Sequence, residues 1–93
     1  MRLAPGRLVT SIAGRDRGQP YLVCAVTKEG YALVVDGDKR SVARPKRKNP
    51  RHLELQPASD DELGSRWEKG EAVTDAEVRT ALQTLTTKLK EAG

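Results

Sequence analysis

The chain has 93 residues, of which 37% are hydrophobic and 32% charged, and it carries a net charge of +4. A chain of this length forms one domain, with or without a tail, around one small core. One histidine and one cysteine leave no internal disulfide, no Cys/His zinc cluster and no spacing from which a catalytic triad can be argued. We therefore expect no enzyme, no catalytic residues, no metal and no cofactor.

Charge is divided unevenly along the chain. Residues 1–55 contain twelve Lys and Arg against five Asp and Glu, whereas residues 56–93 contain five against eight. A basic front half predicts a polyanionic partner for that half only. No apolar run reaches the length of a membrane span, and the first residues form no apolar signal segment. We therefore expect a cytoplasmic protein with no membrane partner and no small-molecule substrate.

Short β-branched runs separated by turn residues predict five strands, at residues 7–12, 21–27, 31–36, 39–43 and 52–55. The first connection, residues 13–20, is bounded by Gly14 and Gly18, which can adopt positive φ. Asp36-Gly37-Asp38 is typical of a tight hairpin turn. Five short strands with tight turns predict an SH3-like barrel.

The alternating run from Leu8 to Ile12, the sequence Gly14-Arg15-Asp16-Arg17-Gly18 and the hydrophobic strand after it resemble the KOW motif. This motif occurs in large-subunit ribosomal proteins and in NusG-type transcription factors. Gly18 stands where the family has its fixed glycine, and Gly14 is the second motif glycine. The resemblance covers about a third of the chain. It implies the same SH3-like barrel and a basic loop that lies on ribosomal RNA.

The acidic C-terminal part predicts two helices, at about residues 60–69 and 75–91. We expect Pro57 to end the β region, Ser59 and Glu62 to cap the first helix, and Gly70 to stop it. Thr74 and Glu77 form a second capping box, and an apolar stripe follows in the second helix. The predicted plan is a barrel over residues 1–56 and a helical extension over 57–93. The extension either packs within the chain, which we favour, or binds a partner.

Basic residues concentrate in the predicted connections and provide the candidate RNA contacts. They are Arg15, Arg17, Lys39, Arg40, Arg44, Lys46, Arg47, Lys48 and Arg51. In an SH3-like barrel the first and fourth connections can approach one rim, so the clusters Arg15–Arg17 and Arg44–Arg51 can meet around one phosphate track, which is a hypothesis. Two alternatives stay open: residues 44–51 form a disordered solvated loop, or Asp16 pairs locally with a neighbouring arginine.

Function follows from this distribution as an expectation. Only three aromatic residues are present, which argues against a platform for stacked single-stranded bases. We expect a non-enzymatic, ribosome-associated protein that contacts the backbone of structured RNA, with ribosomal RNA as its partner. The alternative is a protein-interaction adaptor of the transcription or translation machinery, which would use the barrel and the acidic helices to bind ribosomal or transcription proteins.

Overall fold

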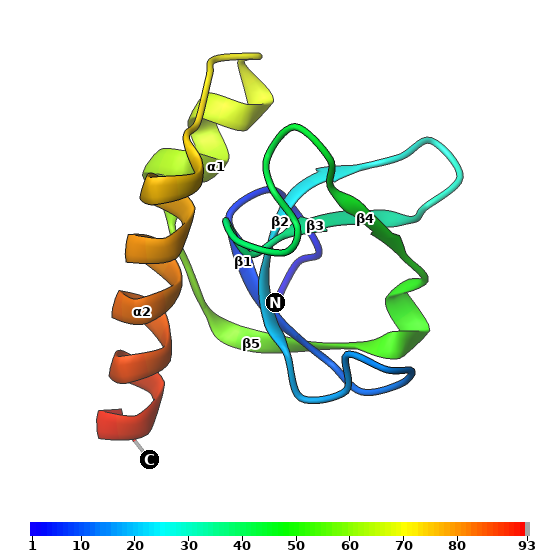
Figure 1. Ribbon diagram of the computed structural model, residues 1–93, viewed down its shortest axis with the longest axis vertical. Coiled ribbons are helices and arrows are strands. Elements are labelled where there is room, and N and C mark those ends of the chain that lie inside the picture. The colour runs from blue at the N-terminus through cyan, green and yellow to red at the C-terminus, as the bar shows by residue number, and fades with distance from the viewer. Residues whose placement is uncertain (93) are drawn as a thin grey trace.

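The computed structural model describes residues 1–92, which form a five-stranded antiparallel sheet followed by two helices. The strands are β1 (Arg7–Ser11), β2 (Pro20–Val26), β3 (Ala32–Val35), β4 (Lys46–Lys48) and β5 (Leu53–Ser59). A short 3-10 helix, η1 (Pro50–His52), precedes β5, and α1 (Asp61–Glu68) and α2 (Asp75–Ala92) follow it. The order in the sheet is β4-β3-β2-β1-β5, so β4 and β5 are its edges. The sheet curves strongly, and α2 runs along one side of it (Figure 1).

Alternation along the strands divides the core between the two faces of the sheet. Leu8, Leu22 and Val35 lie in one buried cluster with α1 and α2. The apolar stripe predicted for the second helix packs into this cluster, where Val78 and Leu82 are buried. The helices therefore pack within the chain, because burial of each such side chain contributes about 1.5–3 kcal/mol. On the other face, the neighbouring strand residues form a second cluster, consisting of Val9, Tyr21, Val23, Ala32, Val34 and Leu53.

The first three strands agree with prediction to within one or two residues, but the fourth does not. Residues 39–43 are not a strand; β4 is Lys46–Lys48, inside the segment that was expected to be a loop. The side chain of Asp36 explains the difference, because its Oδ1 accepts the backbone amides of Asp38 and Arg40 at 2.9 and 2.8 Å. Together with the amides of Asp36 and Gly37, which donate to the carbonyl of Arg40, these bonds close a turn over residues 36–40 that no strand follows. The chain pairs with β3 only from residue 46.

The end of the β region was also predicted wrongly. β5 begins at residue 53 and continues through Pro57 to Ser59, across the expected boundary between barrel and extension. Proline is tolerated because β5 is an edge strand, where a missing amide costs no ladder bond. The pairing of β5 with β1 shifts register between Arg7 and Val9. The guanidinium of Arg7 donates to the carbonyls of Gln56 and Ala58 at 3.3 and 3.5 Å, so these two carbonyls have hydrogen-bond donors where the pairing is irregular.

Local capping signals place both helices. The predicted cap of α1 was wrong by one residue: the N-cap is Asp60, which accepts the amide of Leu63 at 3.0 Å, while Ser59 bonds Asp61. α1 ends as predicted. The amide of Gly70 donates to the carbonyl of Trp67, and the amide of Glu71 donates to the carbonyl of Arg66.

The second capping box is confirmed. Thr74 N donates to Glu77 Oε1 at 3.0 Å, and Glu77 N donates to Thr74 Oγ1 at 3.2 Å. Arg66 reaches the same carboxylate from α1, with 3.0 Å between its Nη2 and Glu77 Oε1. The Arg66 hydrogen bond, followed by the bonds from Thr74, lowers the pKa of Glu77 to about 2. This carboxylate therefore joins the two helices as well as capping α2.

The N-terminal segment crosses α1 at very close range. Gly6 N donates to the carbonyl of Val23 at 2.8 Å, and Gly6 O accepts the amide of Asp60 at 2.9 Å. A β-carbon on Gly6 would collide with the carbonyl of Asp60, and one on Gly64 would collide with the carbonyl of Pro5. Glycine at both positions lets the helix touch the backbone. Neither helix in the described part of the chain is long and apolar enough to cross a membrane.

Candidate nucleic-acid interface

Three segments from different parts of the sequence meet around one basic cleft. The cleft has a volume of about 510 Å³ and receives five cationic side chains, from the β1–β2 loop, the β3–β4 loop and β4. They are Arg15, Arg17, Lys39, Arg40 and Lys46. Two carboxylates, those of Asp16 and Asp36, also line it, so the cleft has three positive charges in excess.

Backbone turns of the β1–β2 loop present the two arginines. Gly14 and Gly18 have φ of 87° and 92°, as the sequence predicted. Gly18 N donates to Ser11 O at 2.8 Å, which closes the loop across the end of β1. Arg15 and Arg17 are exposed on either side of Asp16, which is largely buried. Because the backbone bonds of the loop fix its course, both arginines start from defined backbone positions at the edge of the cleft.

Asp16 is the centre of a network that holds the cleft together. Its Oδ2 accepts Tyr21 Oη at 2.7 Å and Lys46 Nζ at 3.0 Å. Its Oδ1 accepts Ser11 Oγ at 2.8 Å and Lys48 Nζ at 3.1 Å. A single carboxylate therefore connects the β1–β2 loop to β1, β2 and the edge strand β4.

Burial and hydrogen bonding oppose each other at this carboxylate. Burial alone raises the pKa of Asp16, but the donors Tyr21, Ser11, Lys46 and Lys48 outweigh it and hold the pKa well below its usual range. Burial, the hydrogen bond to Asp16 and its negative charge together raise the pKa of Tyr21 well above the usual value. Asp16 is therefore ionised, and Tyr21 neutral, throughout the physiological pH range.

Lys48 does not belong to the exposed surface on which the sequence placed it. Its side chain is only 7% exposed, and Nζ donates to Ser11 Oγ at 2.9 Å and to Ala13 O at 3.2 Å besides Asp16. Three acceptors use the three protons of the ammonium, so none is left for a phosphate. Lys46, at 29% exposure, keeps part of its ammonium in the cleft.

Three other predicted contacts lie outside the cleft lining. Arg44 and Arg51 are exposed, in the β3–β4 loop and in η1 respectively. Arg47 points away from its neighbours Lys46 and Lys48, as alternation in a strand requires, and its guanidinium carbon lies 4.6 Å from the centre of the Tyr31 ring. The structure thus brings five of the nine predicted residues together at the cleft, with Lys48 beneath it. The predicted meeting of the 15–17 and 44–51 clusters is wrong for most of the second cluster, because only Lys46 of residues 44–51 lines the cleft.

Sequence reasoning missed the residues that build the cleft without being cationic. Ser11 and Tyr21 were assigned to strands, with no sign that both bond Asp16. Neither open alternative for the basic segments holds: Asp16 pairs with lysines from β4 rather than with Arg15 or Arg17 among the described bonds, and residues 46–48 form a strand. The useful signal was the alternation Lys46-Arg47-Lys48, which places two lysines on one face.

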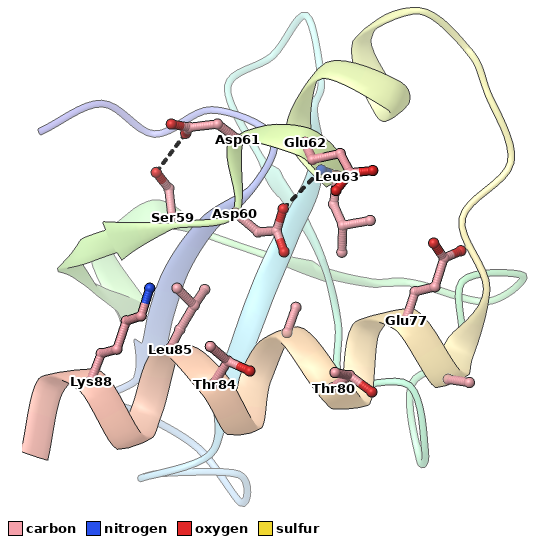
Figure 2. Close-up of a pocket in the computed structure, with 12 residues that line it drawn as sticks. Ser59, Asp60, Asp61, Glu62, Leu63, Glu77, Thr80, Thr84, Leu85 and Lys88 are labelled. Atoms are coloured by element: carbon pink, nitrogen blue, oxygen red, sulfur yellow. Dashed lines mark hydrogen bonds between the residues drawn. The ribbon is translucent and has the colours of Figure 1, made fainter.

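A second groove lies between the first turn of α1 and the middle of α2, where Figure 2 shows Leu63 and Leu85 pointing toward the space between them. Its volume is about 520 Å³. Three of its four acidic side chains are engaged: Asp60 caps α1, Asp61 bonds Ser59, and Glu77 binds Arg66. Glu62 and Lys88, which also line the groove, carry opposite charges, so the groove has no excess of cations that would attract a polyanion.

Within residues 1–92, no three His, Cys, Asp or Glu side chains are arranged to hold a metal ion. Cys24 is partly buried and its Sγ lies 3.4 Å from the carbonyl of Leu33. Burial raises the pKa of its thiol to about 11, which keeps it protonated. The excess of positive charge in the cleft suits the electrostatic binding of an anion.

Comparison with protein-family models gives no match, and comparison with characterised proteins gives none either. The resemblance to the KOW motif therefore stays a prediction that depends on the residues of the β1–β2 loop.

Proposed function

We propose that this protein binds structured RNA, without catalysing a reaction, through the basic cleft. The observation that carries the proposal is the convergence of Arg15 and Arg17 with Lys39, Arg40 and Lys46, which come from segments up to 31 residues apart. Charges scattered only for solubility have no reason to gather around one concavity. A guanidinium group can donate two parallel hydrogen bonds to one phosphate, and an ammonium group adds a point charge.

Structured RNA fits the cleft better than an unstacked single strand. The cleft is lined by cations, and its one aromatic residue, Tyr21, is buried with its hydroxyl bound to Asp16. A surface without exposed aromatic faces recognises backbone and shape rather than bases. Arg44, Arg47 and Arg51 lie outside the cleft lining and are further candidate contacts.

We infer that the curved sheet is an SH3-like barrel of the KOW type. The β1–β2 loop with Gly14 and Gly18, the strand order and the strong curvature of the sheet support this assignment. On that assignment the expected RNA is ribosomal and the expected location is the cytoplasm, where the protein would associate with ribosomes.

Salt-dependent binding tests the proposal directly. The affinity of the purified chain for an RNA hairpin is measured between about 50 and 300 mM salt, for wild type and for a variant with Arg15, Arg17, Lys39 and Arg40 changed to Ala. We expect the variant to bind at least about tenfold more weakly, with a log–log salt slope about two to three units shallower, because each lost phosphate contact removes about one unit.

The control removes the same number of charges elsewhere, by changing Lys28, Lys69, Lys88 and Lys90 to Ala. All four are exposed and none lines the cleft. Their loss lowers the net charge equally, so it reports the non-specific contribution. Equal slopes for the two variants would remove the cleft from the contact surface, and no salt-dependent RNA binding by the wild type would end the proposal.

A protein-interaction adaptor is the second candidate, and the observation that favours it is the groove between α1 and α2 (Figure 2). Its apolar floor, with Leu63 and Leu85, suits a partner side chain. The two functions differ in their response to salt. Association with ribosomes that is released at high salt supports RNA binding, whereas salt-resistant capture of a single protein without RNA supports the adaptor.

A further inference from the structure

The first turns of α2 hold the loop that carries Lys39 and Arg40. The amide of Val42 donates to Asp75 Oδ1 at 2.8 Å, and Nη1 of Arg79 donates to the carbonyl of Gly37. These two bonds enclose residues 38–41, so both cations of the loop lie between points fixed to the helix. Neither contact is local, because the partners are 33 and 42 residues apart in the chain.

Steric fit makes this contact specific. Gly37 has a φ of 77°, and a β-carbon there would lie 2.5 Å from the carbonyl oxygen of Asp75 and 2.9 Å from Cγ of Arg79. Only glycine allows the loop to approach the helix so closely. At the far end of the loop, Val42 packs against the hydrophobic cluster beneath α2. The loop is thus docked on the helix at both ends.

The same loop is fixed from the cleft side by Asp36, which accepts the amides of Asp38 and Arg40. Lys39 lines the basic cleft and also a smaller depression of about 280 Å³ that Arg79 lines from α2. α2 therefore reaches the border of the cleft. Its position decides where the loop presents its cations.

We propose that Asp75 and Arg79 are positioning residues of the RNA-binding surface, and that α2 orders the 38–41 loop so that Lys39 and Arg40 meet phosphates together. This inference rests on the proposed function. A loop ordered before binding loses less conformational freedom on binding. The helical extension, although acidic, thereby increases the affinity of the basic half for RNA.

The sign of one substitution separates positioning from simple electrostatics. Removing the negative charge of Asp75 near a polyanion should tighten RNA binding if only charge matters. If Asp75 positions the loop, Asp75→Ala should weaken binding, because Val42 N loses its acceptor. Asp75→Asn removes the same charge but keeps an Oδ1 that can accept the amide. Both variants lose the same charge, and only Asp75→Asn keeps an acceptor for the amide of Val42.

The experiment measures hairpin RNA affinity and its salt slope for wild type, Asp75→Ala and Asp75→Asn, together with amide hydrogen exchange at residues 38–42. We expect Asp75→Ala to bind about five- to tenfold more weakly, with faster exchange at Val42, and Asp75→Asn to bind at least as tightly as wild type. Arg79→Gln, which removes the long donor from Gly37, is expected to speed exchange at residues 38–40.

Each outcome bears on one proposal. If Asp75→Ala binds as tightly as Asp75→Asn, or more tightly, positioning by α2 is wrong, whereas RNA binding by the cleft is unaffected. If wild type binds no RNA, the proposed function fails, and the exchange data still report whether α2 orders the loop. If hydrogen exchange at Val42 is unchanged in Asp75→Ala, and circular dichroism shows that this variant remains folded, the proposal that α2 orders the 38–41 loop is overturned.

Discussion

Replacing Asp16 with Asn tests whether one carboxylate holds the cleft together. The substitution keeps the shape of the side chain but removes the charge that faces Lys46 and Lys48. The two lysines contribute unequally. Lys46 is 29% exposed, so its pair is worth less than about 1 kcal/mol. Lys48 is 7% exposed, so its ammonium would be left charged, buried and without a counter-ion.

The expected cost follows from that buried charge. Removing one partner of a buried ion pair costs about 3–5 kcal/mol. Because Asp16 itself is 14% exposed and water can reach one side of it, we expect the lower end, about 3 kcal/mol. For a chain of this size that lowers Tm by about 12–24 °C. The measurement is urea unfolding at pH 7, followed by the fluorescence of Trp67, which packs against the core.

Two further variants make the result decisive. Asp38→Asn changes an exposed aspartate of the neighbouring loop, and we expect an effect within about 0.5 kcal/mol. Combining Asp16→Asn with Lys48→Met removes the stranded ammonium and should recover part of the loss. A loss of unfolding free energy below about 1 kcal/mol for Asp16→Asn would refute the reasoning. It would mean that the ammonium of Lys48 does not depend on the charge of Asp16.

Two other predictions concern α2 and pH. Thr74→Ala removes the hydroxyl that caps α2 and should lower the free energy of unfolding by about 1 kcal/mol. Thr74→Ser keeps the hydroxyl, so its free energy of unfolding should stay near that of the wild type. Equal urea midpoints for the two variants would contradict the capping role. The pKa values of Asp16 and Glu77 are both lower in the folded protein than in the unfolded chain, so the unfolded chain binds protons first. Their stabilisation is fully present above the ordinary carboxylate range, and the Glu77 part is lost as the pH falls from about 4.5 through about 2. Urea midpoints should therefore decrease with acidification, and less steeply for Asp16→Asn; parallel pH curves for wild type and this variant would show that Asp16 does not titrate abnormally.

Where structure depends on neighbours in the chain, the sequence predicted it well. The strands before residue 36 and the capping box of α2 are set by local alternation and by bonds over three residues. Gly70 ended α1 as expected for the same reason. The five cations of the cleft were all among the predicted contacts, because basic residues in connections are visible in composition.

The errors arose where a distant partner decides the conformation. Asp36-Gly37-Asp38 was interpreted as a hairpin turn, but the loop that follows is held by Asp75 and Arg79 of α2. Lys48 was interpreted as a surface cation, but its counter-ion is 32 residues away. Pro57 was interpreted as the end of the sheet, which only the edge position of β5 contradicts. None of these pairings leaves a mark in a single sequence.

The crossing of Gly6 and Gly64 has a consequence for the order in which the protein can fold. Residues 5 and 6 lie against α1, which is synthesised almost sixty residues later. The contact between residues 5–6 and α1 therefore cannot form until residue 64 has been synthesised. Contacts this distant slow folding. Until then, residues 5 and 6 lack the packing that α1 provides.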